Sequence, residues 1–130
     1  MKTVTAAILI KDKKILIAKR KSSDKLANKW EFPGGTVEDG ETPEQCLQRE
    51  MKEEFCIDVC VSEFFGESLY QYSHESIKLL AYLTQWQGGV MESKAHDDFC
   101  WISVNELRNY DFAPADIPFV EKIRKEYIEL

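Results

Sequence analysis

The sequence lacks any run of about 18 apolar residues, so a membrane-spanning helix is not expected. The opening segment MKTVTAAILI is apolar, but lysines follow Ile10 and no small-residue cleavage site comes after it. This pattern favours a first strand over a signal peptide. Internal repeats, linkers and low-complexity tracts are also missing, while 44% of the 130 residues are hydrophobic, which excludes disorder as a class. We expect one domain over residues 1–130.

The sequence also has no excess of basic residues. The net charge of −6 argues against binding to a nucleic-acid polymer, because a phosphate backbone requires a basic surface. The charge is unevenly distributed: residues 11–29 contain eight Lys or Arg against two Asp, whereas residues 31–58 contain nine Asp or Glu against two Lys or Arg. A basic segment before an acidic one suits a site that holds phosphates and a metal, although two solvated faces would give the same pattern.

Cysteine pairs with zinc or redox spacing are lacking. The sequence contains no C-x-x-C pair, and its cysteines form no zinc-ligand pattern with the two histidines, His74 and His96. We therefore expect reduced, mostly buried thiols and a cytoplasmic location. Both histidines lie in polar segments and are expected to be incidental rather than ligands.

Strand patterns surround one strongly marked helix. Thr42 at the N-cap, Pro43 at the first helical position and Gln45 at the third form a capping box, which predicts a helix over residues 43–55. Pro33-Gly34-Gly35 is a breaker that should end a short strand at 30–32. A short helix is expected from Ser103 to Arg108 and a final amphipathic helix over 116–129. Other strands are expected at residues 3–10, 14–18, 57–65, 76–85 and 99–102. Strands without regular βαβ alternation indicate an α+β fold with helices packed on a mixed sheet.

The helix over 43–55 places its glutamates unusually. Projected at about 100° per residue, Leu47, Met51 and Phe55 form an apolar stripe. The opposite, solvated side is expected to carry Gln45, Gln48, Arg49 and Lys52. Glu50, Glu53 and Glu54 lie at i, i+3 and i+4 along one flank, where like charges repel by roughly 0.2–0.5 kcal/mol per pair. A hard divalent cation would remove that repulsion, so the flank predicts a metal site, with an acidic solubilising face as the alternative.

The residues around this helix resemble a known family. Gly35, five residues, Glu41, seven residues and then Arg49-Glu50-Met51-Lys52-Glu53-Glu54 is similar to the Nudix box, G-x5-E-x7-R-E-U-x-E-E-x-G-U. The segments LANKWEFPGG, ETPEQ and FAPADIP resemble the MutT-type branch, whose members act on oxidised guanine or on cytidine nucleotides. The resemblance implies a Nudix fold, in which a mixed sheet lies between helices.

The resemblance also implies an activity and a set of site residues. The activity is hydrolysis of a nucleoside triphosphate to a monophosphate and diphosphate, with Mg²⁺, or Mn²⁺ in its place, as cofactor. Glu50, Glu53, Glu54 and the carbonyl of Gly34 or Gly35 are implied as metal ligands, and Arg49 and Glu41 as further catalytic residues. Arg49 would orient a glutamate. Substrate contacts are implied for Arg20, Phe32, Tyr72 and Asp116. We expect a small nucleotide as partner, no membrane, and a monomer or weak homodimer.

Three positions depart from the family pattern. Cys56 stands where the family has the glycine that ends the helix. Ala95 stands where members of the branch often have a glutamate, for which Asp97, Asp98, Glu92 or Glu53 would substitute. Asp116 stands where the oxidised-guanine enzymes have asparagine; an ionised carboxylate only accepts hydrogen bonds, which favours a base offering donors. The alternatives are a catalytically weak nucleotide-binding module and a hydrolase of another nucleoside diphosphate derivative.

Overall fold

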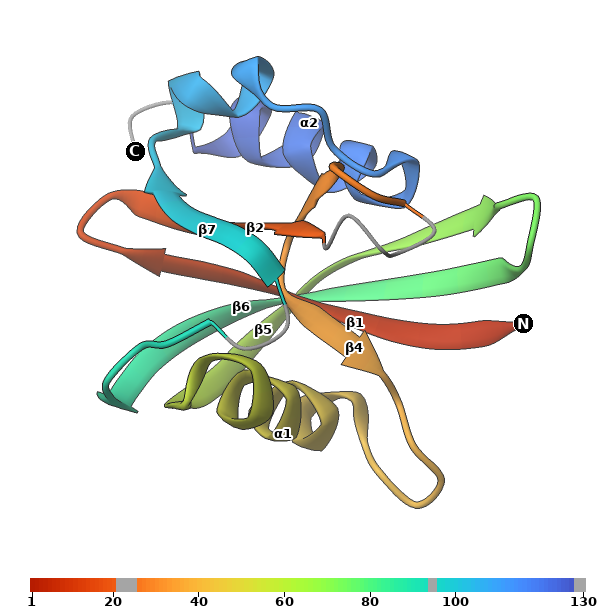
Figure 1. Ribbon diagram of the computed structural model, residues 1–130, viewed down its shortest axis with the longest axis horizontal. Helices are drawn as coiled ribbons and strands as arrows, with labels where there is room; N and C mark the ends of the chain where they lie inside the picture. The colour runs from red at the N-terminus through yellow and green to blue at the C-terminus, as the bar shows by residue number, and fades with distance from the viewer. Residues whose placement is uncertain (21–25, 94–95, 128–130) are drawn as a thin grey trace.

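The computed structural model describes residues 1–20, 26–93 and 96–127. The bounds in chain order are β1 Lys2–Lys11, β2 Lys14–Arg20, β3 Trp30–Glu31, β4 Gly34–Thr36, α1 Pro43–Phe55, β5 Ile57–Gln71, β6 Ser76–Gly89, β7 His96–Ile102, the 3₁₀ helices η1 Val104–Asn109 and η2 Pro114–Asp116, and α2 Ile117–Glu126. A mixed sheet lies between α1 on one face and α2 with the 3₁₀ helices on the other (Figure 1). This confirms the expected fold class.

The helix over 43–55 has the predicted bounds. Its N-cap is Thr42, whose hydroxyl accepts from the Gln45 backbone N–H, while the Gln45 side chain accepts from the Thr42 N–H. Its C-cap, Cys56, lies in the left-handed region with φ 61°. The chain therefore makes the turn that the family makes with glycine, and makes it with a side chain present.

Several other elements differ from the sequence prediction. The strands β5 and β6 are longer than expected because they pair with each other along nearly their whole lengths. The glycines expected only as a breaker form β4, which pairs antiparallel with β1. The segment after Ser103 is a 3₁₀ helix, and α2 spans residues 117–126 rather than 116–129. Residues 128–130 lie outside the described part.

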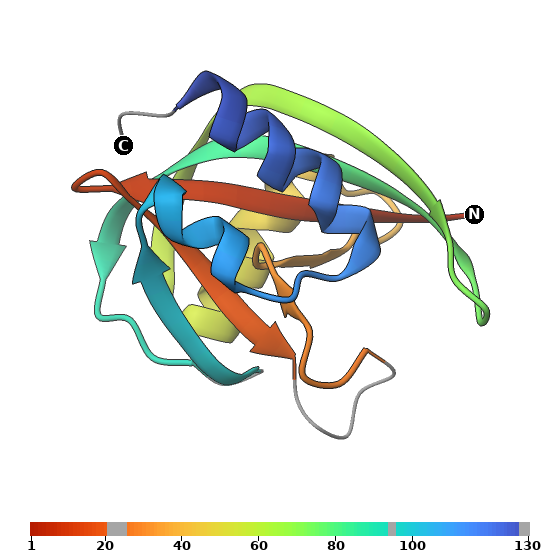
Figure 2. The same cartoon turned by 90° about the horizontal axis from the view of Figure 1, so that it is seen from above.

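The sheet follows the order β3-β2-β1-β6-β5, with β4 also on β1 and β7 also on β2. Strand β1 pairs in parallel with β6 from Lys2 to Leu9 and antiparallel with β4 from Val4 to Ala6. These pairings place the glycines of β4 beside the centre of β1. The view from above shows the paired β5 and β6 running beside β1, with α2 lying across them (Figure 2).

Alternate side chains of β1 enter two separate cores. Ala6 and Ile8 belong to the core under α2 and the 3₁₀ helices, whereas Ala7 and Leu9 belong to the core under α1. Leu47, Met51 and Phe55 are fully buried in the second core, which confirms the apolar stripe. This packing fixes α1 against β1 and β4, where the candidate site lies.

In the described part of the chain, none of the helices has the length and apolar character that crossing a membrane requires. The four cysteines are free thiols, and only Cys46 is buried, so the expectation of mostly buried thiols was wrong.

Candidate active site

A cavity of about 500 Å³ opens between β1, β4 and the hairpin of β5 and β6. Its walls combine a carboxylate of the glutamate helix, Glu54, with both glycines of β4. The four residues predicted to contact substrate also line it: Arg20, Phe32, Tyr72 and Asp116. Residues far apart in the sequence therefore meet in one space, although their roles stay predictions.

Phe32 and Asp116 form the deep wall of this pocket. The ring of Phe32 stacks on Phe112 at a centroid distance of 5.3 Å, and the Phe32 backbone N–H donates to Asp116 Oδ1 at 3.1 Å. Burial, with the nearby charge of Glu31, raises the pKa of Asp116 well above its usual value. A protonated carboxyl both donates and accepts, so the expectation of an acceptor-only side chain does not apply to that form.

Tyr72 and His74 form the side wall at the hairpin tip. The Tyr72 hydroxyl accepts from the Ala115 backbone N–H at 3.0 Å, which ties the hairpin to η2. The His74 ring stacks on Tyr72 at 5.5 Å with an interplanar angle of 16°, and only 22% of its side chain is exposed. The interpretation of His74 as an incidental residue stays a prediction, and nothing in its local pattern signals that its ring lies beside the pocket.

Arg20 reaches the same pocket from the end of β2. Its Nη1 donates to Glu31 Oε1 at 2.8 Å, which holds the guanidinium against β3. Glu31 also lines the pocket and was missed by the sequence analysis, since a single glutamate beside Trp30 carries no distinctive pattern.

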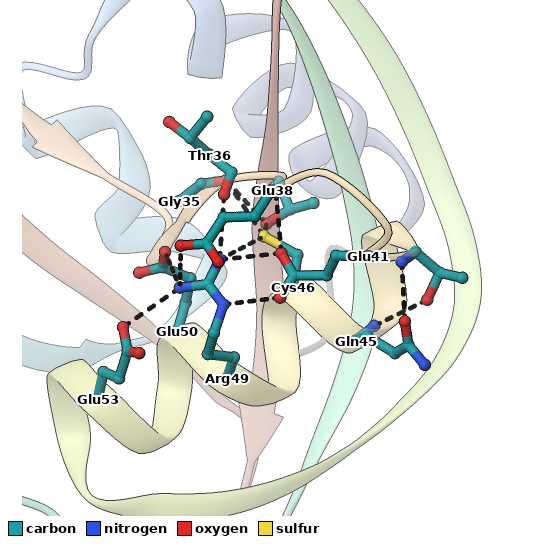
Figure 3. Close-up of polar contacts among 11 residues, drawn as sticks. Gly35, Thr36, Glu38, Glu41, Gln45, Cys46, Arg49, Glu50 and Glu53 are labelled. Atoms are coloured by element: carbon teal, nitrogen blue, oxygen red, sulfur yellow. Dashed lines mark hydrogen bonds and ion pairs between the residues drawn. The ribbon is translucent and has the colours of Figure 1, made fainter.

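Arg49 lies at the centre of a carboxylate network beside the pocket (Figure 3). Its Nε and Nη2 donate to the two oxygens of Glu41 at 2.7 and 2.9 Å, and Nη1 donates to Glu50 at 2.8 Å and Glu53 at 3.2 Å. Nη2 also donates to the Thr36 carbonyl at 3.1 Å. Arg49 is hydrogen-bonded to glutamates, as expected for a residue that orients one, although that role stays a prediction. Its side chain is 23% exposed rather than fully solvated, because the loop over 36–41 packs beside it.

The guanidinium of Arg49 stabilises the ionised form of Glu41. Hydrogen bonds from this guanidinium and from the Glu38 backbone N–H lower the pKa of Glu41 to about 2. Glu41 is therefore ionised at neutral pH and hydrogen-bonded to Arg49, so it helps to hold Arg49 in position.

The three helix glutamates have different surroundings. The Glu50 side chain is 14% exposed and that of Glu53 is 60% exposed, and both reach Arg49. Glu54 points into the pocket, and its Oε2 is buried without a hydrogen-bond partner among the described residues. Burial and the nearby carboxylates of Glu50 and Glu31 raise the pKa of Glu54 to about 9.

The two glycines of β4 differ in what their carbonyls can do. Ala7 donates to Pro33 O at 2.7 Å and Val37 to Thr3 O at 3.0 Å, and hydrogen-bonded pairs alternate in antiparallel strands. Thr5 and Gly35 therefore form a hydrogen-bonded pair, whereas Ala6 and Gly34 form a non-hydrogen-bonded pair. The Gly35 carbonyl faces β1, whereas that of Gly34 points away from β1, so the register favours Gly34 as a ligand.

The residues present fit a divalent cation. A buried carboxylate oxygen without a partner, next to two further carboxylates, is unfavourable unless the group is protonated or a cation binds. Glycine is needed here too, since a Cβ on Gly35 would lie 2.2 Å from the Glu50 carboxyl carbon. Within the described residues, however, no three His, Cys, Asp or Glu side chains already form a metal cluster, because Arg49 holds Glu50 and Glu53.

Of the residues expected to substitute for the missing glutamate at Ala95, Glu53 belongs to the carboxylate network, whereas Glu92 and Asp98 lie elsewhere. Glu92 Oε2 accepts from the Cys56 thiol at the end of α1. Asp98 alternates with Phe99, which packs on Phe55 under α1, so Asp98 belongs to the opposite face of β7. Ala95 and the side chain of Asp97 lie outside the described residues.

Comparison with known proteins gives consistent matches over most of the chain. A sequence model described as NUDIX domain matches residues 1–123. A CTP pyrophosphohydrolase of Escherichia coli (strain K12) is 38% identical over 118 residues, covering 91% of this chain and 87% of the relative. An 8-oxo-dGTP diphosphatase of the same strain is 35% identical over 111 residues, covering 85% and 86%. The solution structure of the E. coli ORF135 protein matches with a TM-score of 0.82 at 34% identity, covering 99% of this chain and 94% of that one.

Proposed function

The chain belongs to the NUDIX family, and from this premise we propose that it is a hydrolase that cleaves a nucleoside triphosphate to a nucleoside monophosphate and diphosphate. The observation that carries the proposal is the single pocket in which Glu54 and the β4 glycines share walls with Phe32 and Asp116. One end of this space suits a metal and phosphates, and the other suits a flat base. The relatives, a CTP pyrophosphohydrolase and an 8-oxo-dGTP diphosphatase, act on substrates of this class.

Hydrolases of this family generally require a divalent cation, for which we propose Mg²⁺ with Mn²⁺ as a substitute. Glu50, Glu53, Glu54 and the Gly34 carbonyl would hold it. The bound ion would supply water activation and neutralisation of phosphate charge. Arg49 keeps Glu50 and Glu53 beside Glu54, and Glu41 keeps Arg49 in place, so the two carboxylates would have to turn from Arg49 toward the cation when it enters.

The nucleoside would occupy the other end of the pocket. Phe32 and Tyr72 offer aromatic surfaces for a base, and Asp116 offers a carboxyl whose protonated form matches donors and acceptors alike. Arg20, fixed by Glu31, is placed to contact the substrate from the β2 side. Both a cytidine nucleotide and an oxidised guanine nucleotide fit this set of groups.

A panel of kcat/KM values tests the proposal. The panel comprises 8-oxo-dGTP, dGTP, dCTP, 5-methyl-dCTP, CTP and ADP-ribose, each with and without Mg²⁺. We expect Mg²⁺-dependent diphosphate release from one or more triphosphates and little turnover of ADP-ribose. Glu53→Gln should lower kcat by orders of magnitude, whereas Glu44→Gln, an exposed glutamate on the same helix, should not. Absence of turnover together with tight nucleotide binding would support a binding module instead.

A further inference from the structure

Thr5 is a buried hydroxyl in the middle of an otherwise apolar stretch of β1. Thr5 is 1% exposed and is flanked in the sequence by Val4 and Ala6. It lies on the α1-facing side of the strand, as do Ala7 and Leu9. Burying a hydroxyl is unfavourable unless it is hydrogen-bonded, and valine would fill the same space in a strand. The buried hydroxyl is therefore expected to have a specific role in hydrogen bonding.

The partners of Thr5 lie far away in the sequence, in the glycine strand and in α1. Thr5 Oγ1 donates to the Gly35 carbonyl at 3.2 Å and lies 3.3 Å from Cys46 Sγ. The Cys46 thiol itself reaches the Gly35 carbonyl at 3.5 Å, and Arg49 Nη2 donates to its sulfur at 3.8 Å. A chain of contacts thus connects Arg49, Cys46 and Thr5 to one backbone carbonyl, part of which is visible in Figure 3.

That carbonyl determines where two groups of the metal site lie. The Gly34 carbonyl, which points away from β1, shares a rigid peptide plane with the Gly35 N–H, so holding Gly35 in place also limits how the Gly34 carbonyl can turn. On the other side, the Glu50 carboxyl rests against Gly35, with its atoms 2.2–2.6 Å from where a Cβ would be. A rotation of the Gly35 peptide would therefore move both groups.

We propose that the Thr5 hydroxyl and the Cys46 thiol are positioning groups that hold the Gly35 carbonyl and thereby orient the Gly34 carbonyl and Glu50 toward the divalent cation. The inference rests on the proposed function, because it assigns a role within the same metal site. Both residues act through the glycine strand, and neither binds the cation itself.

Isosteric variants separate this role from simple packing. Thr5→Val keeps the shape and removes the hydroxyl, whereas Thr5→Ser keeps the hydroxyl and removes a methyl group. Thr84→Val is the matched control, since Thr84 is 3% exposed and its hydroxyl donates to the Tyr82 carbonyl within β6. The affinity for Mn²⁺ is measured by calorimetry without nucleotide, alongside kcat, KM and the thermal midpoint of the metal-free protein.

We expect Thr5→Val to weaken Mn²⁺ binding by about tenfold and to lower kcat with little change in KM, as loss of a group that orients ligands does. Thr5→Ser and Thr84→Val should stay within about twofold of the parent in Mn²⁺ affinity. The inference is overturned if folded Thr5→Val binds Mn²⁺ like the parent, or if Thr5→Ser loses as much affinity as Thr5→Val.

A second pair of variants tests the inference if Thr5→Val does not fold. Cys46→Ala should then weaken Mn²⁺ binding relative to Cys46→Ser, whose hydroxyl restores a donor, and equal affinities of this pair would overturn the inference. Failure of the proposed function gives a different result: the parent protein itself would bind no Mn²⁺ and release no diphosphate.

Discussion

Residues with unfavourable individual environments gather around α1. Cys56 has a left-handed backbone that favours glycine, and Glu54 buries a carboxylate oxygen that has no partner in the described part of the structure. Arg49, in contrast, satisfies three carboxylates at once. The strain at Cys56 and the burial of Glu54 are separable, because each can be removed by one substitution.

Cys56→Gly should raise the free energy of unfolding by about 0.5–1 kcal/mol. A side chain in the left-handed region is destabilising by roughly 1–2 kcal/mol, part of which glycine loses again through its greater freedom in the unfolded chain. Urea denaturation of metal-free protein measures the change. Cys56→Ala is the control: it removes the same thiol but keeps the Cβ, so a gain equal to that of glycine would contradict the backbone explanation.

Glu54→Gln should be more stable than the parent in EDTA, by roughly 1–3 kcal/mol at pH 8. Because the folded-state pKa of about 9 lies above the unfolded value of 4.5, the parent loses stability as pH rises through this window. Glutamine does not titrate, so its advantage should be absent below about pH 4.5. Thermal or urea melts across pH 4–9 measure it.

The response to metal should reverse this order. With Mg²⁺ present, the parent should gain thermal stability, and Glu54→Gln should gain less, together with a kcat lowered by orders of magnitude. Glu44→Gln controls for the loss of one charge on the same helix. Equal Mg²⁺-induced shifts in parent and Glu54→Gln would contradict a role for Glu54 in binding the cation.

At the scale of elements, the site depends on how closely β4 approaches its neighbours. A Cβ on Gly34 would lie 1.9 Å from the Thr5 carbonyl oxygen, and a Cβ on Gly35 would meet the Glu50 carboxyl. The first obstacle is rigid strand backbone, and the second is the end of a flexible side chain. The two glycines are therefore needed for different reasons, one for the packing of β4 on β1 and the other for the position of Glu50.

Alanine at each glycine should separate these two reasons. Gly35→Ala should displace the Glu50 carboxyl and lower kcat strongly, with a small loss of stability. Gly34→Ala should instead destabilise the fold by about 1–3 kcal/mol or more, because backbone must shift. Denaturation and diphosphate release measured on both variants check the contrast, which fails if Gly34→Ala is the more stable of the pair.

At the scale of the whole molecule, the pocket depends on contacts between distant parts of the chain. The Tyr72 hydroxyl accepts from Ala115, and the Phe32 N–H donates to Asp116, so η2 is held by both the β5–β6 hairpin and the segment after β3. The placement of Asp116 in the pocket is thus a consequence of two bonds that span 84 and 43 residues of sequence.

Tyr72→Phe should test this tie. The variant leaves the buried Ala115 N–H without its acceptor, which should reduce the free energy of unfolding by about 1–3 kcal/mol. Because η2 carries Asp116, we expect KM for the nucleotide to rise more than kcat falls. Tyr70→Phe, a neighbouring and more exposed tyrosine, is the control. An unchanged KM in Tyr72→Phe would separate the hairpin from substrate binding.

The sequence by itself determined the glutamate helix with its cap and the family, because these depend on local chemistry and on spacing along one element. The apolar stripe of Leu47, Met51 and Phe55 followed from helical periodicity in the same way. The departure at Cys56 was visible too, since a glycine position specifies a backbone angle.

Only the tertiary structure decided which of these groups meet. The partial burial of Arg49, the pairing of β4 with β1 and the opposite directions of the Gly34 and Gly35 carbonyls depend on strand register and on elements far apart in the chain. The same holds for the places of Thr5, Glu31 and His74. Local pattern carries no information about such contacts, because burial and the pKa shifts of Glu54 and Asp116 arise when separate segments exclude water together.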